Sequence, residues 1–248
     1  MNNEHAPHHP RHEPLDLAVT LHKSVVATPP DPSPDVARVA AMFGLGVDAT
    51  REITVLPRCT FTLRGARLVF VTGPSGSGKS TLLRCLADTL ETRGDASTCD
   101  FHALPALPDR PLVDTLPVDA LEDRLRLLSI AGLGDAPVML RRPSELSDGQ
   151  RYRLRLAHAM ALTEADPRPE LRVLLADEFG ATLDRRTAAN VAAQLRKWVR
   201  RQPGVCFVCA TTHDDLLEPL EPDVLIEVPL GEAVHVYQRT VAPEGSAS

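Results

Sequence analysis

The sequence predicts an α/β fold with a mainly parallel sheet, an antiparallel β edge and a short helical insert. Three observations predict it. Strand-like apolar runs alternate with helix-like stretches from residue 68 to residue 238, which is typical of parallel strands joined by helices. Runs such as residues 173–176 are continuously apolar, which indicates strands buried on both faces. A β-rich start, with strands expected at 52–56 and 60–64, predicts the antiparallel edge.

The remaining elements follow in order along the chain. Further strands are expected near residues 68–72, 171–176, 205–211, 223–229 and 233–238, and a strand or turn near 96–101. Helices are expected near residues 79–92, 118–131, 149–163, 184–201 and 213–218. We expect three regions: a largely flexible Pro/His-rich arm at 1–34, a main domain at 35–240 with a helical subdomain at about 103–165, and a disordered tail at 241–248. Within the arm, only residues 15–26 have the pattern of a strand.

Composition indicates one main domain whose cysteines remain reduced thiols. The 248 residues are 43% hydrophobic and 24% charged, enough to bury a full core. No apolar segment approaches the roughly 18 residues that span a bilayer, and the start lacks a secretory leader, so we expect a cytoplasmic protein without membrane insertion. Cys206 and Cys209 lie three apart in an expected strand and would face opposite sides, which disfavours a shared metal.

A glycine-rich loop joins the strand expected at 68–72 to the helix expected at 79–92. Its residues are Gly73, Pro74, Ser75, Gly76, Ser77, Gly78, Lys79 and Ser80, followed by Thr81. The spacing Gly-x4-Gly-Lys-Ser is typical of a phosphate-binding loop, in which backbone N–H groups and the positive end of the helix dipole face the phosphates. Lys79 is expected to reach the β- and γ-phosphates and Ser80 to bind Mg²⁺. The sequence therefore predicts a site for a nucleoside triphosphate.

Two later runs place polar side chains at the same edge of the sheet. Asp177 and Glu178 follow the run at 173–176, beside the expected phosphate-binding loop. Asp177 is placed to hold Mg²⁺ through water, and strand alternation would turn Glu178 toward a water that attacks the γ-phosphate. The run that starts at Cys206 ends at His213, so His213 is also expected near the γ-phosphate.

Five segments in fixed order resemble the ATP-binding cassette (ABC) ATPases. Besides the phosphate-binding loop they are residues 146–150 (Leu-Ser-Asp-Gly-Gln), 171–178, 181–184 (Ala-Thr-Leu-Asp) and 210–213. The resemblance extends from about residue 52 to about residue 238 and is closest to soluble, stand-alone members, some of them fused to an acetyltransferase-like domain. It implies ATP and Mg²⁺ as cofactors, Glu178 as the catalytic base, His213 as the switch histidine and Asp184 as part of the D-loop.

The same resemblance makes residues 146–150 the signature motif, at the start of a helix-like stretch. In the family this helix end, here carrying Ser147, Gly149 and Gln150, contacts the ATP held by a second subunit. A chain with one cassette is therefore expected to form a head-to-tail homodimer around two ATP molecules. Asp148 stands where the family more often has glycine, and a carboxylate there would slow closure or hydrolysis.

Two features depart from the transporter members of the family. Residues 81–145 contain no glutamine, so the Q-loop glutamine, which in transporters contacts Mg²⁺, water and the membrane domain, is absent. Asp109 is the candidate substitute. Phe43 is a candidate for stacking on adenine, with core packing as the alternative.

These features predict Mg-dependent ATP hydrolysis by a cassette that dimerises on ATP and acts on an unidentified soluble partner. Two alternatives remain open: the nucleotide-binding subunit of an ABC transporter, and a P-loop phosphotransferase in which the signature serves only structure. Nucleic acid is a possible but less favoured partner, because a net charge of −6 opposes broad attraction to phosphate backbones.

Overall fold

A six-stranded sheet in the order β4-β5-β6-β3-β7-β8 forms the centre of the computed structural model, which describes residues 16–31, 33–46, 50–166 and 171–239. Its strands are β3 (Arg67–Thr72), β4 (Ala96–Asp100), β5 (Leu171–Ala176), β6 (Val205–Ala210), β7 (Val224–Glu227) and β8 (His235–Gln238). Neighbouring strands are parallel except for the antiparallel pair β7 and β8. The predicted mainly parallel sheet is confirmed.

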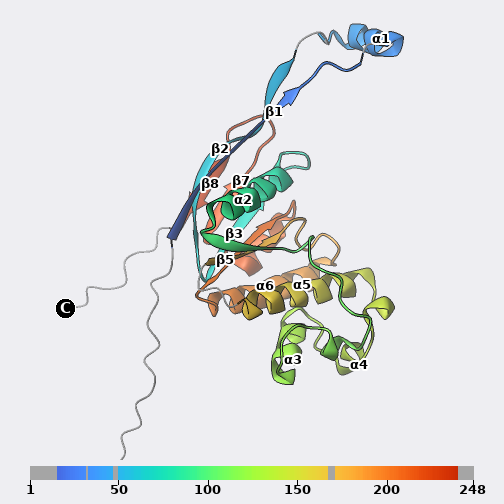
Figure 1. Cartoon of the computed structure of the whole chain (residues 1–248), viewed down its shortest axis with the longest axis vertical. Coiled ribbons are helices and arrows are strands. Elements are labelled where there is room, and N and C mark those ends of the chain that lie inside the picture. The colour runs from blue at the N-terminus through green and yellow to red at the C-terminus, as the bar shows by residue number, and fades with distance from the viewer. Residues whose placement is uncertain (1–15, 32, 47–49, 167–170, 240–248) are drawn as a thin grey trace, which may run out of the picture.

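Helices cover both faces of this sheet, and the apolar runs explain why. Helix α2 (Lys79–Arg93) lies on one face, where Leu82 and Leu86 are fully buried. Helices α5 (Asp148–Ala165) and α6 (Arg185–Arg200) lie side by side on the other face (Figure 1). Cys206 packs in the first core and Cys209 in the second, as alternation in β6 predicts.

A long two-stranded ribbon covers α2 on its outer side. Strand β1 (Asp16–Ala27) pairs antiparallel with β2 (Arg51–Arg64), and Leu17, Val19 and Leu21 are buried in the same core as α2. Residues 16–27 are therefore a strand, in the part of the expected arm (15–26) whose sequence pattern indicated one. The two short strands expected at 52–56 and 60–64 are one continuous strand, because Pro57 sits in a ribbon that pairs on one side only.

The ribbon carries a helix that the sequence analysis did not foresee. Helix α1 (Pro34–Phe43) begins at an N-cap, Ser33, whose Oγ accepts a hydrogen bond from the Val36 N–H, and ends at Gly44 in the left-handed conformation. Figure 1 places it at the far tip of the ribbon, away from the sheet. Residues 1–15, the first part of the expected arm, and residues 240–248, which include the expected tail, lie outside the described residues.

The expected helical insert packs against α5. It contains α3 (Leu121–Ile130), α4 (Ala136–Met139) and two 3-10 turns, η1 (Leu112–Asp114) and η2 (Pro143–Glu145). Leu127 and Leu128 of α3 are fully buried in the core that α5 and α6 share. The short elements η3 (Asp214–Leu216) and α7 (Leu217–Leu220) follow β6. None of the described helices combines the length and apolar character needed to cross a bilayer.

Candidate functional site at the carboxyl edge of the sheet

The phosphate-binding loop leaves β3 and enters α2 with a backbone that only glycine permits. At Gly73 the φ angle is 144°, and a Cβ there would lie 2.2 Å from the carbonyl oxygen of Val228. Gly78, with φ at 103°, is the N-cap of α2, and no side chain caps the helix. The first turn carries no acidic residue either. The N–H groups and dipole of α2 therefore face the loop without an internal anion to occupy them.

Lys79 reaches back across this loop. Its Nζ donates hydrogen bonds to the carbonyl oxygens of Gly73 and Pro74, both at 2.8 Å. Partial burial lowers the pKa of Lys79, and the charges of Asp177 and Glu178 oppose that effect. The ammonium group is thus held by neutral carbonyls that a phosphate oxygen could replace.

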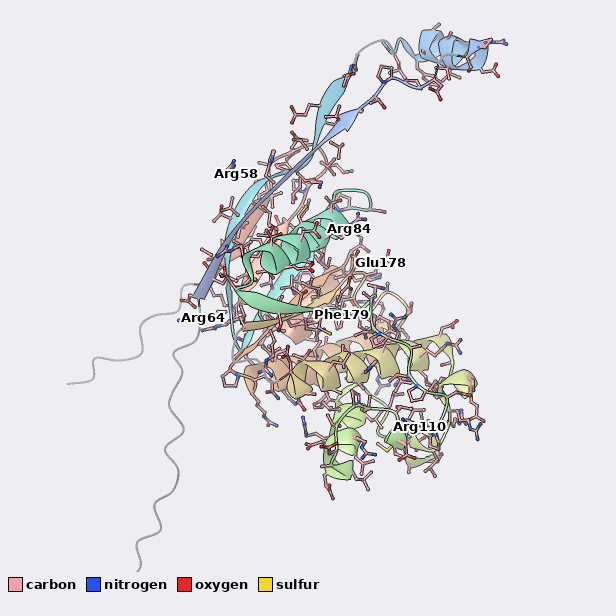
Figure 2. The ribbon with its side chains drawn as sticks, in the orientation of Figure 1. Arg58, Arg64, Arg84, Arg110, Glu178 and Phe179 are labelled. Carbon is pink, nitrogen blue, oxygen red and sulfur yellow. The ribbon has the colours of Figure 1, made fainter. Side chains whose placement is uncertain are left out.

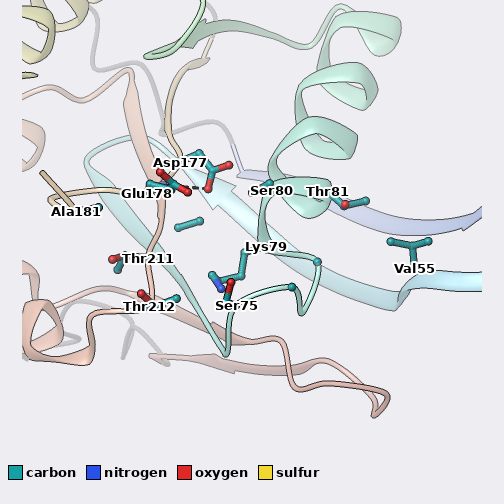
Figure 3. Close-up of a pocket in the computed structure, with 13 residues that line it drawn as sticks. Val55, Ser75, Lys79, Ser80, Thr81, Asp177, Glu178, Ala181, Thr211 and Thr212 are labelled. Carbon is teal, nitrogen blue, oxygen red and sulfur yellow. Dashed lines mark hydrogen bonds between the residues drawn. The ribbon is translucent and has the colours of Figure 1, made fainter.

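Asp177 and Glu178 follow β5 directly and face Lys79 and Ser80 across the site (Figure 3). The Glu178 N–H donates to Asp177 Oδ1 at 3.0 Å. Glu178 has a φ angle of 48°, the left-handed region that non-glycine residues adopt at a cost of about 1–2 kcal/mol. Both residues lie in a turn beyond the strand, so the left-handed backbone, not strand alternation as predicted, separates the directions of the two side chains.

These residues enclose a cavity of about 430 Å³. Its walls are Val55, Ser75, Gly76, Gly78, Lys79, Ser80, Thr81, Asp177, Glu178, Ala181, Ala210, Thr211 and Thr212. The structure thus brings together most of the predicted loop and both acidic residues. Val55 from β2 and the two threonines after β6 are wall residues that were not predicted from the sequence. The position of the two threonines directly after an apolar strand could have predicted their place in the wall, whereas no sequence pattern marks Val55.

His213 stands one residue beyond this wall. It is the N-cap of η3, and its N–H donates to Thr211 Oγ1 at 3.2 Å. The hydrogen bond from Arg185 is the main cause of the lowered pKa of Asp215, and His213 makes a minor contribution. The predicted edge position of His213 is therefore observed, while its side chain is not among the residues that line the cavity.

The signature residues occupy the N-terminal end of α5 and do not line that cavity. Ser147 Oγ accepts a hydrogen bond from the Gln150 N–H, and Gln150 Oε1 accepts one from the Ser147 N–H, which is a reciprocal capping box.

The residues around this capping box have their own contacts. Asp148 pairs with Arg151 at 2.6 Å and keeps 88% of its side chain exposed. Gly149 packs near Leu183. Asp184 caps α6 by accepting from the Thr187 N–H, and hydrogen bonds with the side chain and the N–H of Thr187 lower its pKa.

Asp109 and Phe43, the two remaining candidates from the sequence, do not line the cavity. Asp109 accepts hydrogen bonds from the N–H and Oγ of Ser144, and these bonds lower its pKa. Its neighbour Arg110 lies beside the small helices, well away from Glu178 (Figure 2). Phe43 is 72% exposed on α1, so it is neither a core residue nor part of the cavity wall. Both residues belong to segments whose tertiary position local sequence does not determine.

Metal binding by cysteine finds no support in the part of the chain that the structure describes. Burial raises the pKa of Cys206 to about 12 and also raises that of Cys209, so both remain protonated thiols at neutral pH. Among the described residues, no group of three or more His, Cys, Asp or Glu side chains gathers as a metal site.

Comparisons with known proteins place this arrangement in a family. A family model described as an AAA ATPase domain matches residues 52–208. The chain is 31% identical over 194 residues to the lipoprotein-releasing system ATP-binding protein LolD of Maricaulis maris, covering 66% of this chain and 82% of that protein. It is also 31% identical over 203 residues to the methionine import ATP-binding protein MetN of Myxococcus xanthus, covering 68% of this chain and 58% of that protein. The chain belongs to the ABC-type ATPases.

Solved structures show the same cassette fold. The dimeric structure of MJ0796, a bacterial ABC transporter cassette, superposes with a TM-score of 0.55 at 22% identity, covering 77% of this chain and 94% of that one. A post-hydrolysis dimer of MJ0796 bound to ADP and Pi gives a TM-score of 0.55 at 19% identity, covering 90% and 100%. These structures establish the ABC fold for this chain. The chain covers 56% to 82% of the length of several curated relatives that it matches.

Proposed function

We propose that this ABC-type cassette binds Mg·ATP in the 430 Å³ cavity and hydrolyses it at a composite site formed with a second cassette. The observation that carries the proposal is the opposition of charges across that cavity. The open N-terminal end of α2 and Lys79 lie on one side, and Asp177 and Glu178 lie on the other. A triphosphate with its metal satisfies both sides at once.

Each wall residue then has a chemical role. The Ser80 hydroxyl and the Asp177 carboxylate are oxygen ligands of the kind Mg²⁺ prefers, and both line the cavity. Lys79 exchanges the carbonyls of Gly73 and Pro74 for phosphate oxygens. Glu178 orients and deprotonates the attacking water. His213 would approach the γ-phosphate from the end of β6, and burial of Mg·ATP between two subunits would exclude bulk water.

The signature end completes this site from another molecule. The N-terminal end of α5, with Ser147, Gly149 and Gln150, lies outside the cavity. Leu183, which directly precedes Asp184, lies near Gly149. A helix end that receives anions is useful only where a phosphate can reach it. We therefore place the ATP of one subunit against the α5 end of the other, in a head-to-tail pair.

Complementation between two inactive variants tests the composite site. Glu178→Gln removes the base and leaves the signature intact, whereas Ser147→Arg blocks the signature and leaves the base intact. Mixed before nucleotide is added, the two should release phosphate faster than the sum of the separate variants, since a heterodimer contains one complete site. Strict additivity, with both variants folded and binding ATP, would contradict the proposal.

For the partner, the relatives favour the transporter alternative. Their names describe import of methionine and release of lipoproteins, so we propose that this cassette drives a membrane protein of a transport system. A soluble partner is the second candidate, favoured by the absence of glutamine from residues 81–145. Membrane proteins encoded beside this chain, co-expressed and purified in detergent, should retain the cassette and stimulate its phosphate release. Failure to associate with any of them would favour the soluble partner.

A further inference from the structure

A histidine outside the cavity wall contacts the turn that carries Glu178. His102 comes two residues after β4, and its Nε2 lies 2.9 Å from the backbone oxygen of Asp177. The carbonyl can only accept, so His102 donates from Nε2. The ring is exposed, and the contact joins residues 75 positions apart.

Helix α5 fixes the backbone on which His102 stands. Arg155 Nη2 donates hydrogen bonds to the carbonyl oxygens of Phe101 and His102, both at 3.0 Å. Its guanidinium also lies over the Phe101 ring, 5.6 Å from the ring centre. Phe101 is buried and packs against Tyr152 with ring centres 4.9 Å apart. The segment 101–102 is thus held to α5 by the hydrogen bonds from Arg155 and by the contacts of the Phe101 ring with Arg155 and Tyr152.

The same helix holds the other end of the Glu178 turn. The Gly180 N–H donates to the hydroxyl of Tyr152 at 2.8 Å, and Tyr152 is buried. One contact therefore acts one residue before Glu178, through His102, and the other acts two residues after it, through Tyr152. Between them, Glu178 has the left-handed φ of 48°. Such a conformation persists where its surroundings over-determine it.

We propose that His102 is a positioning residue that, together with Tyr152, fixes the strained Glu178 turn and links it to the signature end of α5. The proposal rests on the proposed function, because it assigns the role of His102 to ATP hydrolysis. It gives the helical side of the molecule a physical connection to the catalytic turn in a chain that has no glutamine at residues 81–145. A change in the position of α5 would move both ends of the turn.

The first test compares His102→Ala with His102→Gln in the full chain. Loss of the contact misplaces Glu178, so His102→Ala should lower kcat about tenfold while the KM for ATP stays within about twofold. The glutamine amide can donate to the same carbonyl, so His102→Gln should restore most of kcat. Because the ring is exposed, the melting temperature should be unchanged. His22→Ala, on the exposed side of β1, is the matched control.

Several outcomes would overturn the assignment. An unchanged kcat in His102→Ala, a loss expressed in KM, or equal defects in the alanine and glutamine variants would each remove the positioning role. Hydrolysis by the unmodified chain separates this failure from that of the proposed function. If the unmodified chain binds ATP and releases no phosphate, the proposed function is contradicted, whereas an active parent with an equally active His102→Ala contradicts only the role of His102.

A double variant tests the link to α5. Tyr152→Phe removes the hydroxyl that accepts from Gly180, and it should also lower kcat with little change in KM. If both contacts hold one turn, combining it with His102→Ala should cost less than the product of the two single effects. Independent, multiplicative effects in folded proteins would contradict a shared turn.

Discussion

The N-terminal ends of α2 and α5, both assigned to ATP binding from the sequence, differ in which backbone N–H groups they leave free. The N-terminal end of α2 has a glycine N-cap, no side-chain cap and no acidic residue in its first turn, and it opens into a cavity. The N-terminal end of α5 is closed by its own Ser147–Gln150 capping box and carries Asp148. In the proposed function the first end receives an anion bound by the same chain, and the second receives one bound by another molecule.

The largest effect is expected at the acidic side of the α2 cavity. Glu178→Gln removes the general base, and phosphate release should fall by about 10²–10⁴-fold. ATP affinity should be unchanged or higher, since a carboxylate near the triphosphate is neutralised. Steady-state phosphate release and equilibrium binding of a fluorescent ATP analogue measure the two quantities. Equal activity in the variant would remove Glu178 from the reaction.

Ser147→Arg tests whether the α5 end acts only in trans. The substitution fills the space at the signature, so hydrolysis should fall by about 100-fold, in the range seen when one anion-stabilising group is lost. Binding of ATP to dilute protein should be unaffected, because Ser147 is outside the cavity. A matched Ser144→Arg variant on η2 serves as the control. If the Ser147 variant lost ATP binding in dilute protein, the two helix ends would belong to one site.

Lys79→Ala tests the α2 end alone. Loss of a charge-assisted bond of about 1.5–3 kcal/mol should weaken ATP binding by about 10- to 100-fold, even in monomeric protein. Lys197→Ala, on the exposed side of α6, is the control. Titration of fluorescent ATP into both variants measures the difference. An equal affinity in the two would show that the lysine does not contact the phosphates.

The smallest effect is expected at Asp148. Its carboxylate faces the solvent at the α5 end and would oppose an incoming phosphate, so Asp148→Gly should raise phosphate release about twofold to fivefold, as expected for a screened surface charge. The gain should shrink as salt is added. The melting temperature should fall slightly, because the variant loses an N-terminal negative charge and the pair with Arg151. A slower variant would contradict the repulsive role.

Sequence reasoning found the sheet and the α2 end because both depend on local patterns. Apolar runs followed by polar residues located Asp177 and Glu178, and glycine spacing located the phosphate-binding loop. Glu178 lines the cavity, but its direction was attributed to strand alternation, whereas a left-handed turn held by distant contacts sets it. His102 was missed for the same reason, as its partner lies 75 residues away. No local pattern distinguished exposed Phe43 from a core or binding aromatic.

The most direct test of the composite site is the oligomeric state of Glu178→Gln by light scattering, with and without Mg·ATP. The α2 end of each subunit should hold ATP, and the α5 end of the other should close on it. The variant should therefore be a monomer without nucleotide and a dimer with Mg·ATP, and Ser147→Arg in the same background should abolish the dimer. A variant that binds Mg·ATP and remains monomeric at high protein concentration would contradict the account.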